Sequence, residues 1–281
     1  TPAPSHARAV REAAAALRAA GHEVVAFEPG DVLRDAVASY VSLLAADGNF
    51  RSFIDALEGE PLHPTYAFLQ RVATMPKWLR PLLSWAFSTL LGQQRKGTLV
   101  AVGRGKSAHE YWQATAERDA LRKRLVGAME GAQLDALLCP GLGLPAFPHG
   151  TSVLLNQACS YTFVWNNFNL PAGTLPVTAV REDEQEYDGS PHRDGFTEAA
   201  KQALKGSAGL PVGVQERGLR PPLNQPRTAA PAPSPNTPRP CPLIQVVGLP
   251  WRDEATLGAM AALEKALNVP SPMPQAIAPP R

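Results

Sequence analysis

The stretch that most constrains the fold is residues 158–180, ACSYTFVWNNFNLPAGTLPVTAV. Its first half is an apolar and aromatic run that is too long for one strand. The aromatic residues fall at mixed spacings, so a helix here is apolar almost all round and is expected to be buried. After Pro171-Ala172-Gly173, a β-branched run extends to Val180 and predicts a buried strand. The pattern alone predicts a core helix and a core strand, with no function attached.

Helices and short strands alternate along the rest of the chain, which predicts an α/β fold with a mixed β-sheet flanked by helices. Its 281 residues are enough to bury a sizeable core in one or two domains. A first helix, capped by Ser5 and ended by Gly21, is expected over residues 6–20. Further helices are predicted over residues 31–46, 107–133, 193–205 and 253–267. Strands are predicted over residues 22–27, 134–140 and 210–215, and a loop or short strand over residues 97–105.

Residues 65–94 are predicted to form a helical hairpin. Pro76 and Pro81 divide this segment into two short helices, and the basic residues Lys77 and Arg80 lie among its apolar side chains. Tryptophan and leucine with basic neighbours suit a helix that lies in a membrane interface. The alternative is a helical hairpin buried in the core. The side chains expected to touch a membrane are Trp78, Leu79, Leu82, Leu83, Trp85 and Phe87.

Residues 216–245 differ in composition from the rest of the chain. They contain nine prolines and no apolar periodicity, so this segment is predicted to be a disordered insertion. It divides the chain into residues 1–215, the insertion, and residues 246–281 with a loose proline-rich tail. A stretch rich in Pro, Leu, Ser and Thr that ends in Gln is what a translated splice acceptor would encode. A retained intron or faulty gene model is therefore one hypothesis, and a genuine surface loop is the other.

Charge and cysteine content argue against several classes of protein. The formal charge of +2 offers no basic face for nucleic acid. Cys139, Cys159 and Cys241 lie far apart, which fits buried thiols in a reducing compartment rather than disulfides or a metal site. No apolar run reaches the roughly 18–20 residues of a membrane span. Thr1 is preceded by neither a methionine nor a signal peptide, which predicts a fragment boundary.

Several stretches resemble the C-terminal half of amidase-signature hydrolases, and within that family the fatty acid amide hydrolases. They are MPKW at residues 75–78, LDALLCP at 134–140, YTFVWNNFNLPAGTLPVT at 161–178, GLPVGVQ at 209–215 and VVGLPW at 246–251. The resemblance covers nearly the whole chain except residues 216–245. It implies that the hairpin over residues 65–94 is a hydrophobic helical membrane cap, through which a lipid substrate enters. It implies hydrolysis of an acyl amide by a serine nucleophile that is activated through a second serine and a lysine, without metal or cofactor.

The residues that carry this chemistry in the family lie in a GGSSGGE-type segment and an upstream lysine. No such segment occurs in this chain, and no serine lies in a glycine-rich turn. No catalytic residue is therefore assigned. The chain is expected to supply the far wall of the substrate site instead, and a sheet without its partner strands is expected to be poorly stable alone.

The resemblance implies a set of acyl-channel residues, matched position by position. They are Leu69, Leu99, Asn156, Cys159, Phe163 and Phe196, and we call them the acyl-wall residues. Their types suit an apolar tunnel, although each is also compatible with ordinary core packing. Ala45 stands where the family carries an aromatic near the portal, and Phe196 replaces a tryptophan. These departures predict a different acyl preference.

The sequence thus predicts the C-terminal part of a serine amidase that hydrolyses fatty acid amides to fatty acid and amine. Its expected partners are a fatty acyl amide substrate and a membrane surface, with a homodimer left open and no nucleic acid. Its expected location is intracellular, peripheral on the cytoplasmic side of endomembranes. Two alternatives stand beside it: a non-catalytic, membrane-peripheral lipid-binding or scaffold protein of the same fold, and an amidase for short polar amides.

Overall fold

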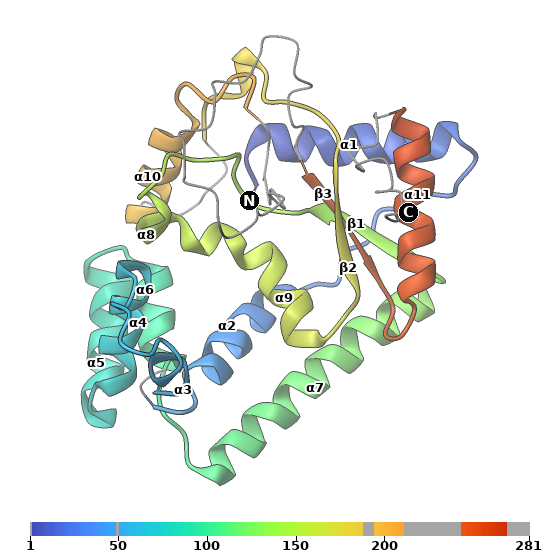
Figure 1. The fold of residues 1–281 in the computed structure, drawn as a ribbon. Helices are drawn as coiled ribbons and strands as arrows, with labels where there is room; N and C mark the ends of the chain where they lie inside the picture. The colour runs from blue at the N-terminus through green and yellow to red at the C-terminus, as the bar shows by residue number, and fades with distance from the viewer. Residues whose placement is uncertain (1, 49–50, 188–193, 211–242, 269–281) are drawn as a thin grey trace, which may run out of the picture.

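The structure, a computed structural model, describes residues 2–48, 51–187, 194–210 and 243–268. Within them, strands β1 (Ala136–Pro140), β2 (Ala172–Pro176) and β3 (Leu243–Gly248) form one sheet in the order β1-β3-β2 (Figure 1). The helices are α1 (Pro4–Ala19), α2 (Val32–Leu44), α3 (Arg51–Asp55), α4 (Pro64–Thr74), α5 (Arg80–Trp85), α6 (Gln94–Val102), α7 (Ala108–Gly131), α8 (Ser152–Leu155), α9 (Ser160–Phe168), α10 (Gly195–Leu204) and α11 (Asp253–Leu267). Short 3-10 or π segments are η1 (Lys77–Leu79), η2 (Ala86–Leu90), η3 (Asn156–Cys159) and η4 (Glu182–Glu184).

The sheet is antiparallel at both of its pairings. Leu138 of β1 lies opposite Val246, and Thr174 of β2 lies opposite Gln245 on the other side of β3. The prediction of a mixed sheet is therefore wrong for the described strands. A mixed sheet needs two neighbouring strands that run in the same direction. Strands β1 and β2 run in the same direction, but β3 lies between them and is antiparallel to both.

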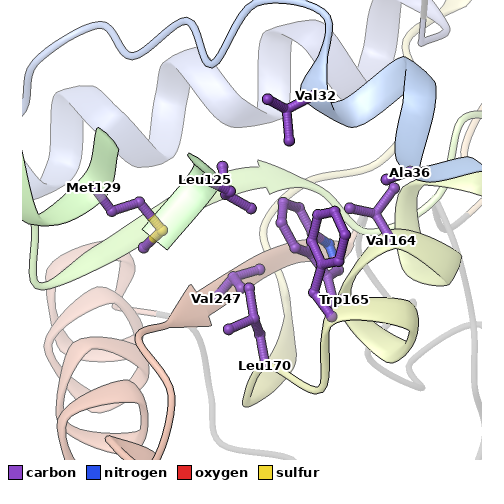
Figure 2. Packing of buried hydrophobic residues seen from close by; sticks show 9 residues of the cluster. Val32, Ala36, Leu125, Met129, Val164, Trp165, Leu170 and Val247 are labelled. Atoms are coloured by element: carbon purple, nitrogen blue, oxygen red, sulfur yellow. The ribbon is translucent and has the colours of Figure 1, made fainter. Parts of the chain in front are cut away.

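Helices cover both faces of this sheet, as the α/β prediction requires. Residues of β3 alternate between the two faces, in keeping with the two-residue period of a strand. Ile244 and Val246 pack with α1 and α11, whereas Val247 packs with α2, α7 and α9 (Figure 2). Trp165 of α9 packs in the same cluster as Val247, and its indole Nε1 donates a hydrogen bond of 3.0 Å to Gln245 Oε1. The predicted core helix thus forms and packs directly on the central strand.

The later helices lie where the sequence predicts them. The helix predicted over residues 107–133 is α7, and Ser107 caps it through a reciprocal bond with Glu110. The helix predicted over residues 253–267 coincides with α11. The first helix differs at its start. It begins at Pro4, whose fixed φ suits a first turn, and Ser5 is buried inside that turn, so the prediction of Ser5 as cap is wrong.

Two strand predictions need correction. Residues 22–27 pair with no described strand, and the exposure of Val25, at 49%, reflects this. The strand after Gly173 ends at Pro176 rather than at Val180, because proline has no N–H to donate to a neighbouring strand. It is also half-exposed rather than buried, since β2 lies at an edge of the described sheet.

The predicted hairpin is helical, but its parts differ from the prediction. Pro81 does not break it, because it lies in the first turn of α5, and η1, α5 and η2 follow one another without interruption. The predicted loop or short strand over residues 97–105 is wrong for residues 97–102, which belong to α6. Helix α6 packs against α5 and η2 through Gly97, where a Cβ would lie 2.9 Å from Ser84 O. A small residue at this position therefore allows the two arms to approach.

The predicted strand at residues 210–215 lies, after Leu210, outside the described residues. So does the insertion over residues 216–245, except for its last three positions. Those three begin β3, where Ile244 is fully buried and Gln245 is 5% exposed.

Candidate functional site

The acyl-wall residues lie on α4, α6, η3, α9 and α10, which are connected to one another through contacts with α2 and α8. Leu69 of α4 and Leu99 of α6 pack in the same apolar cluster, together with Val41 and Ala45 of α2. Ala45, where the family resemblance implies an aromatic, is 1% exposed. Its small side chain lets α2 lie close to its neighbours at this point.

Phe163 extends this cluster onto α9 through an aromatic stack. Its ring lies 4.6 Å from the ring of Tyr40, centroid to centroid, with an interplanar angle of 16°. Burial raises the pKa of Tyr40, and the nearby Tyr66 and Cys159 add to this effect. Tyr40 is therefore neutral and joins Leu69, Leu99, Cys159 and Phe163 into one surface. Sequence reasoning missed Tyr40, although it lies one residue before Val41 on the same amphipathic helix.

Asn156 and Phe196 lie at the other end of this set of helices, on η3 and α10. Phe196 is held by Arg95 of α6, whose guanidinium carbon lies 4.5 Å from the ring centroid. Arg95 Nη1 also lies 2.6 Å from a carboxylate oxygen of Asp194, the residue that caps α10. This ion pair connects α6 to the helix that carries Phe196.

The six predicted membrane-contact residues separate into two sets along η1, α5 and η2. Trp78, Leu82 and Trp85 form an exposed stripe at helical spacing, with exposures of 78%, 58% and 53%. We call these three residues the aromatic stripe. Leu79, Leu83 and Phe87 are half-buried, and the Phe87 ring meets that of Phe68 edge-on.

No helix of the described residues is both long and apolar enough to cross a bilayer. Within the same residues, no group of three His, Cys, Asp or Glu side chains could hold a metal ion. Burial raises the pKa of the Cys139 thiol to about 12 and raises that of Cys159 as well. Both thiols are therefore protonated near neutral pH and are not activated nucleophiles.

His6 is a buried histidine that the fold holds in its neutral form. It is 1% exposed, Nδ1 lies 3.4 Å from Ser5 Oγ, and Nε2 has no hydrogen-bond partner among the described residues. Burial lowers the pKa of His6 to about 3, against the opposing effect of Glu184. An unfolded histidine titrates near pH 6.5, so between these two values only the unfolded chain binds the proton. His6 thus stabilises the fold above about pH 6.5, and this contribution is lost as the pH falls toward 3.

Acidification from pH 7 to pH 4 is expected to lower the free energy of unfolding by about 2–3 kcal/mol through His6 alone. Urea unfolding across this range measures the change. The variant His6→Gln should show a flatter pH dependence than the parent chain, because its side chain does not titrate. The exposed His22→Gln is the control and should keep the parent's slope. Equal slopes for all three proteins would contradict the buried neutral state of His6.

With this geometry established, comparison with known proteins identifies the class. The family model described as amidase matches residues 1–220, and the chain belongs to the amidase family.

Within that family the chain is similar to fatty acid amide hydrolases. It is 30% identical over 270 residues to "Fatty acid amide hydrolase 1" of Caenorhabditis elegans, covering 95% of this chain and 41% of the relative. It is 28% identical over 272 residues to "Fatty-acid amide hydrolase 1" of Sus scrofa, with the same coverage. A solved "Fatty acid amide hydrolase" shares the fold at a TM-score of 0.60 and 16% identity, over 95% of this chain and 38% of that one. The chain thus spans about two fifths of the length of these relatives.

Proposed function

We propose that this chain is part of a serine amidase that hydrolyses fatty acid amides to fatty acid and amine. In this proposal it contributes one wall of the acyl channel and a surface that contacts the membrane. The observation that carries the proposal is the clustering of three acyl-wall residues from three helices, Leu69 of α4, Leu99 of α6 and Phe163 of α9, around Tyr40 of α2. Membership of the amidase family and the names of its relatives supply the reaction class.

The apolar character of this wall supports a long acyl chain over a short polar amide. Leu69, Leu99 and Phe163 present hydrocarbon, and the neutral Tyr40 adds an aromatic face. Each methylene that leaves water for such a surface contributes about 0.8 kcal/mol to binding. A chain of ten or more methylenes therefore gains far more from this wall than a short substrate does.

The aromatic stripe supports a peripheral position on a membrane, with the cytoplasmic side of endomembranes as the proposed location. Trp78 and Trp85 are amphipathic side chains that favour the headgroup region, and Leu82 between them can reach the acyl boundary. Lys77 precedes the stripe, and its side chain is 74% exposed with its ammonium 3.8 Å from Glu110 Oε1, so it can also meet lipid phosphates. Apolar side chains this exposed on adjacent turns are expected to be covered by a partner surface.

The double substitution Trp78→Ala and Trp85→Ala is expected to weaken binding of the chain to phospholipid vesicles about ten- to hundred-fold. The reason is that each indole removes a large apolar area from water when it enters the interface. Vesicle sedimentation measures the change. Trp251→Ala is the matched control, since Trp251 is 84% exposed but lies between β3 and α11, which is far from α5 in the fold (Figure 1). Equal losses for both variants, or no loss for the double variant, would refute the assignment.

Labelling with a serine-directed fluorophosphonate tests the catalytic part of the proposal. This chain alone should remain unlabelled, whereas a longer product of the same transcript that includes a serine-rich amidase segment should be labelled. Labelling of neither, together with binding of a fluorescent fatty acid, would favour the alternative of a non-catalytic lipid-binding or scaffold protein. Labelling of the short chain would show that it contains a nucleophile of its own.

A further inference from the structure

Arg95 of α6 contacts the first turn of α10 in two ways. Its Nη1 lies 2.6 Å from each carboxylate oxygen of Asp194, and its guanidinium carbon lies 4.5 Å from the centroid of the Phe196 ring. Gln93, two residues earlier, accepts a hydrogen bond of 3.4 Å from the N–H of Gly195. The start of α10 is therefore fixed to the start of α6 by neighbouring contacts.

The carboxylate of Asp194 keeps the Arg95 guanidinium in place. Asp194 is 3% exposed and caps α10, where Oδ1 accepts hydrogen bonds of 3.0 Å from the Thr197 N–H and 2.9 Å from the Thr197 hydroxyl. Burial raises the pKa of Asp194, but the hydrogen bonds from Thr197 and Arg95 outweigh it and hold the pKa below its ordinary value. The charged carboxylate is thus buried, and it requires its counter-charge nearby.

Helix α6 is in turn held against the hairpin, so Arg95 projects from a fixed support. Ser84 of α5 donates a hydrogen bond of 2.9 Å from its Oγ to the carbonyl oxygen of Gly97. Leu99, an acyl-wall residue, follows Arg95 by four residues and therefore lies one turn away on the same side of α6. One helix thus carries Leu99 and also positions the Phe196 ring relative to it.

We propose that Arg95 is a positioning residue of the acyl channel, which holds the Phe196 ring in one orientation against the acyl chain. This inference rests on the proposed function, in which Phe196 and Leu99 belong to the same wall. A cation over one face of an aromatic ring fixes the ring and leaves its opposite face to a ligand. Because the ring is ordered before the acyl chain arrives, binding loses no affinity to the ordering of this side chain.

The effect of Arg95 depends on the length of the acyl chain. Leu99 packs in the same cluster as Leu69, whereas Phe196 packs against a separate cluster that contains Leu155. A short acyl chain is accommodated by the first cluster alone, but a long chain extends to Phe196. Arg95 therefore strengthens the binding of long chains and has little effect on short ones, which makes it a determinant of acyl-chain length.

Arg95→Lys separates ring positioning from ion pairing. The ammonium keeps the charge that Asp194 requires, so the variant should unfold like the parent, but it lacks the planar group that lies over the Phe196 ring. Displacement of a fluorescent fatty acid from this chain measures the affinities for laurate and stearate. Arg95→Lys is expected to weaken stearate binding about five-fold and laurate binding less than about two-fold. Asp194→Asn keeps the capping oxygen but releases the guanidinium, and it should give the same change.

Lys96→Met is the matched control. Lys96 follows Arg95 on α6, and its ammonium lies 6.0 Å from the ring centroid of Phe68, which is not an acyl-wall residue. This variant should bind both acids like the parent. Equal weakening of laurate and stearate by Arg95→Lys would indicate a general structural loss and would overturn the proposal, as would unchanged binding of both. Failure of the parent to bind either acid would overturn the proposed wall together with this inference, whereas loss of the length effect alone leaves the proposed function in place.

Discussion

Replacing Arg80 by methionine is expected to lower the free energy of unfolding by about 3–5 kcal/mol. Arg80 is 4% exposed and has no carboxylate partner among the described residues. Its guanidinium donates instead to backbone carbonyls at the ends of two helices, namely those of Val72, Ala73, Met75, Val100 and Gly103. Burial lowers the pKa of Arg80, and Arg104 nearby adds to this, yet arginine remains protonated.

The size of this effect follows from where the carbonyls lie. They belong to the C-terminal ends of α4 and α6, where helices leave carbonyl groups without internal partners and where the helix dipole favours a positive charge. Without the guanidinium several buried acceptors lose their partner at once. We expect the loss of stability to begin as local opening of the helical hairpin over residues 65–94.

Urea unfolding and hydrogen exchange of α4 and α6 measure this effect. Arg80→Lys should recover part of the stability, because an ammonium keeps the charge but reaches fewer of the carbonyls. The control is Arg71→Met, because Arg71 is an arginine in the last turn of α4 itself but is exposed. A change of less than 0.5 kcal/mol, as is common at exposed sites, is expected there. If Arg80→Met proved as mild as its control, the role of Arg80 in holding the two helix ends together would be wrong.

Helices with strong local signals could be predicted from the sequence almost to the residue. Ser107 and Glu110 form the reciprocal cap that their spacing indicates, and α11 follows its acidic first turn. The core helix was also predictable, because a run that is apolar on most sides has no stable place at a surface. These features depend on residues that are neighbours in the chain.

Features that depend on distant residues could not be predicted in the same way. The pattern of residues 22–27 favours a strand, but strand pairing requires a neighbour, and the described residues supply none. Residues 94–102 contain a glycine and three β-branched residues, yet they form α6 because Gly97 lets this helix pack closely on α5. Tertiary contact determines the conformation in both cases.

The candidate site shows the same division. Leu69, Leu99 and Phe163 are placed on one surface, but the residue that joins them, Tyr40, has no motif that marks it. The division of the hairpin into an exposed and a half-buried stripe likewise depends on how α6 packs against it. The sequence shows which residues are apolar, but the fold determines which of them face a ligand, a membrane or the core.

Removing the charge of Glu184 is expected to lower the free energy of unfolding by about 3–5 kcal/mol, the usual effect of breaking a buried ion pair. Glu184 of η4 accepts two hydrogen bonds from Arg8 of α1, at 2.6 Å and 2.8 Å, and both side chains are 9% exposed. Arg8 also donates to Glu12, to Thr178 and to the carbonyl of Ala179. The pair therefore connects α1 to the segment that follows β2.

Glu184→Gln preserves the shape of the side chain but leaves a buried guanidinium without its full counter-charge. The double variant Arg8→Met with Glu184→Leu removes both charges. It should be more stable than the single variant Arg8→Met and than the single variant Glu184→Leu. Glu182→Gln serves as the exposed control on the same short helix. The double variant could instead lose as much free energy of unfolding as the sum of the losses in Arg8→Met and Glu184→Leu. In that case the loss would come from packing, and the ion-pair explanation would fail.

The ion pair of Arg8 and Glu184 loses its stabilising effect over a lower pH range than His6 does. Burial by itself raises the pKa of Glu184, but hydrogen bonds from Arg8 and Arg181 outweigh it, so the pKa lies below the ordinary value. The pair thus stabilises the fold above the pH at which an unfolded glutamate titrates, about 4.3, and this contribution is lost as the pH falls through the lower folded pKa. In Glu184→Gln, the decrease in the free energy of unfolding below about pH 4 should be absent. The decrease that begins near pH 6.5 should remain, because it is due to His6. A variant that lost both would show that the two groups titrate as one coupled unit.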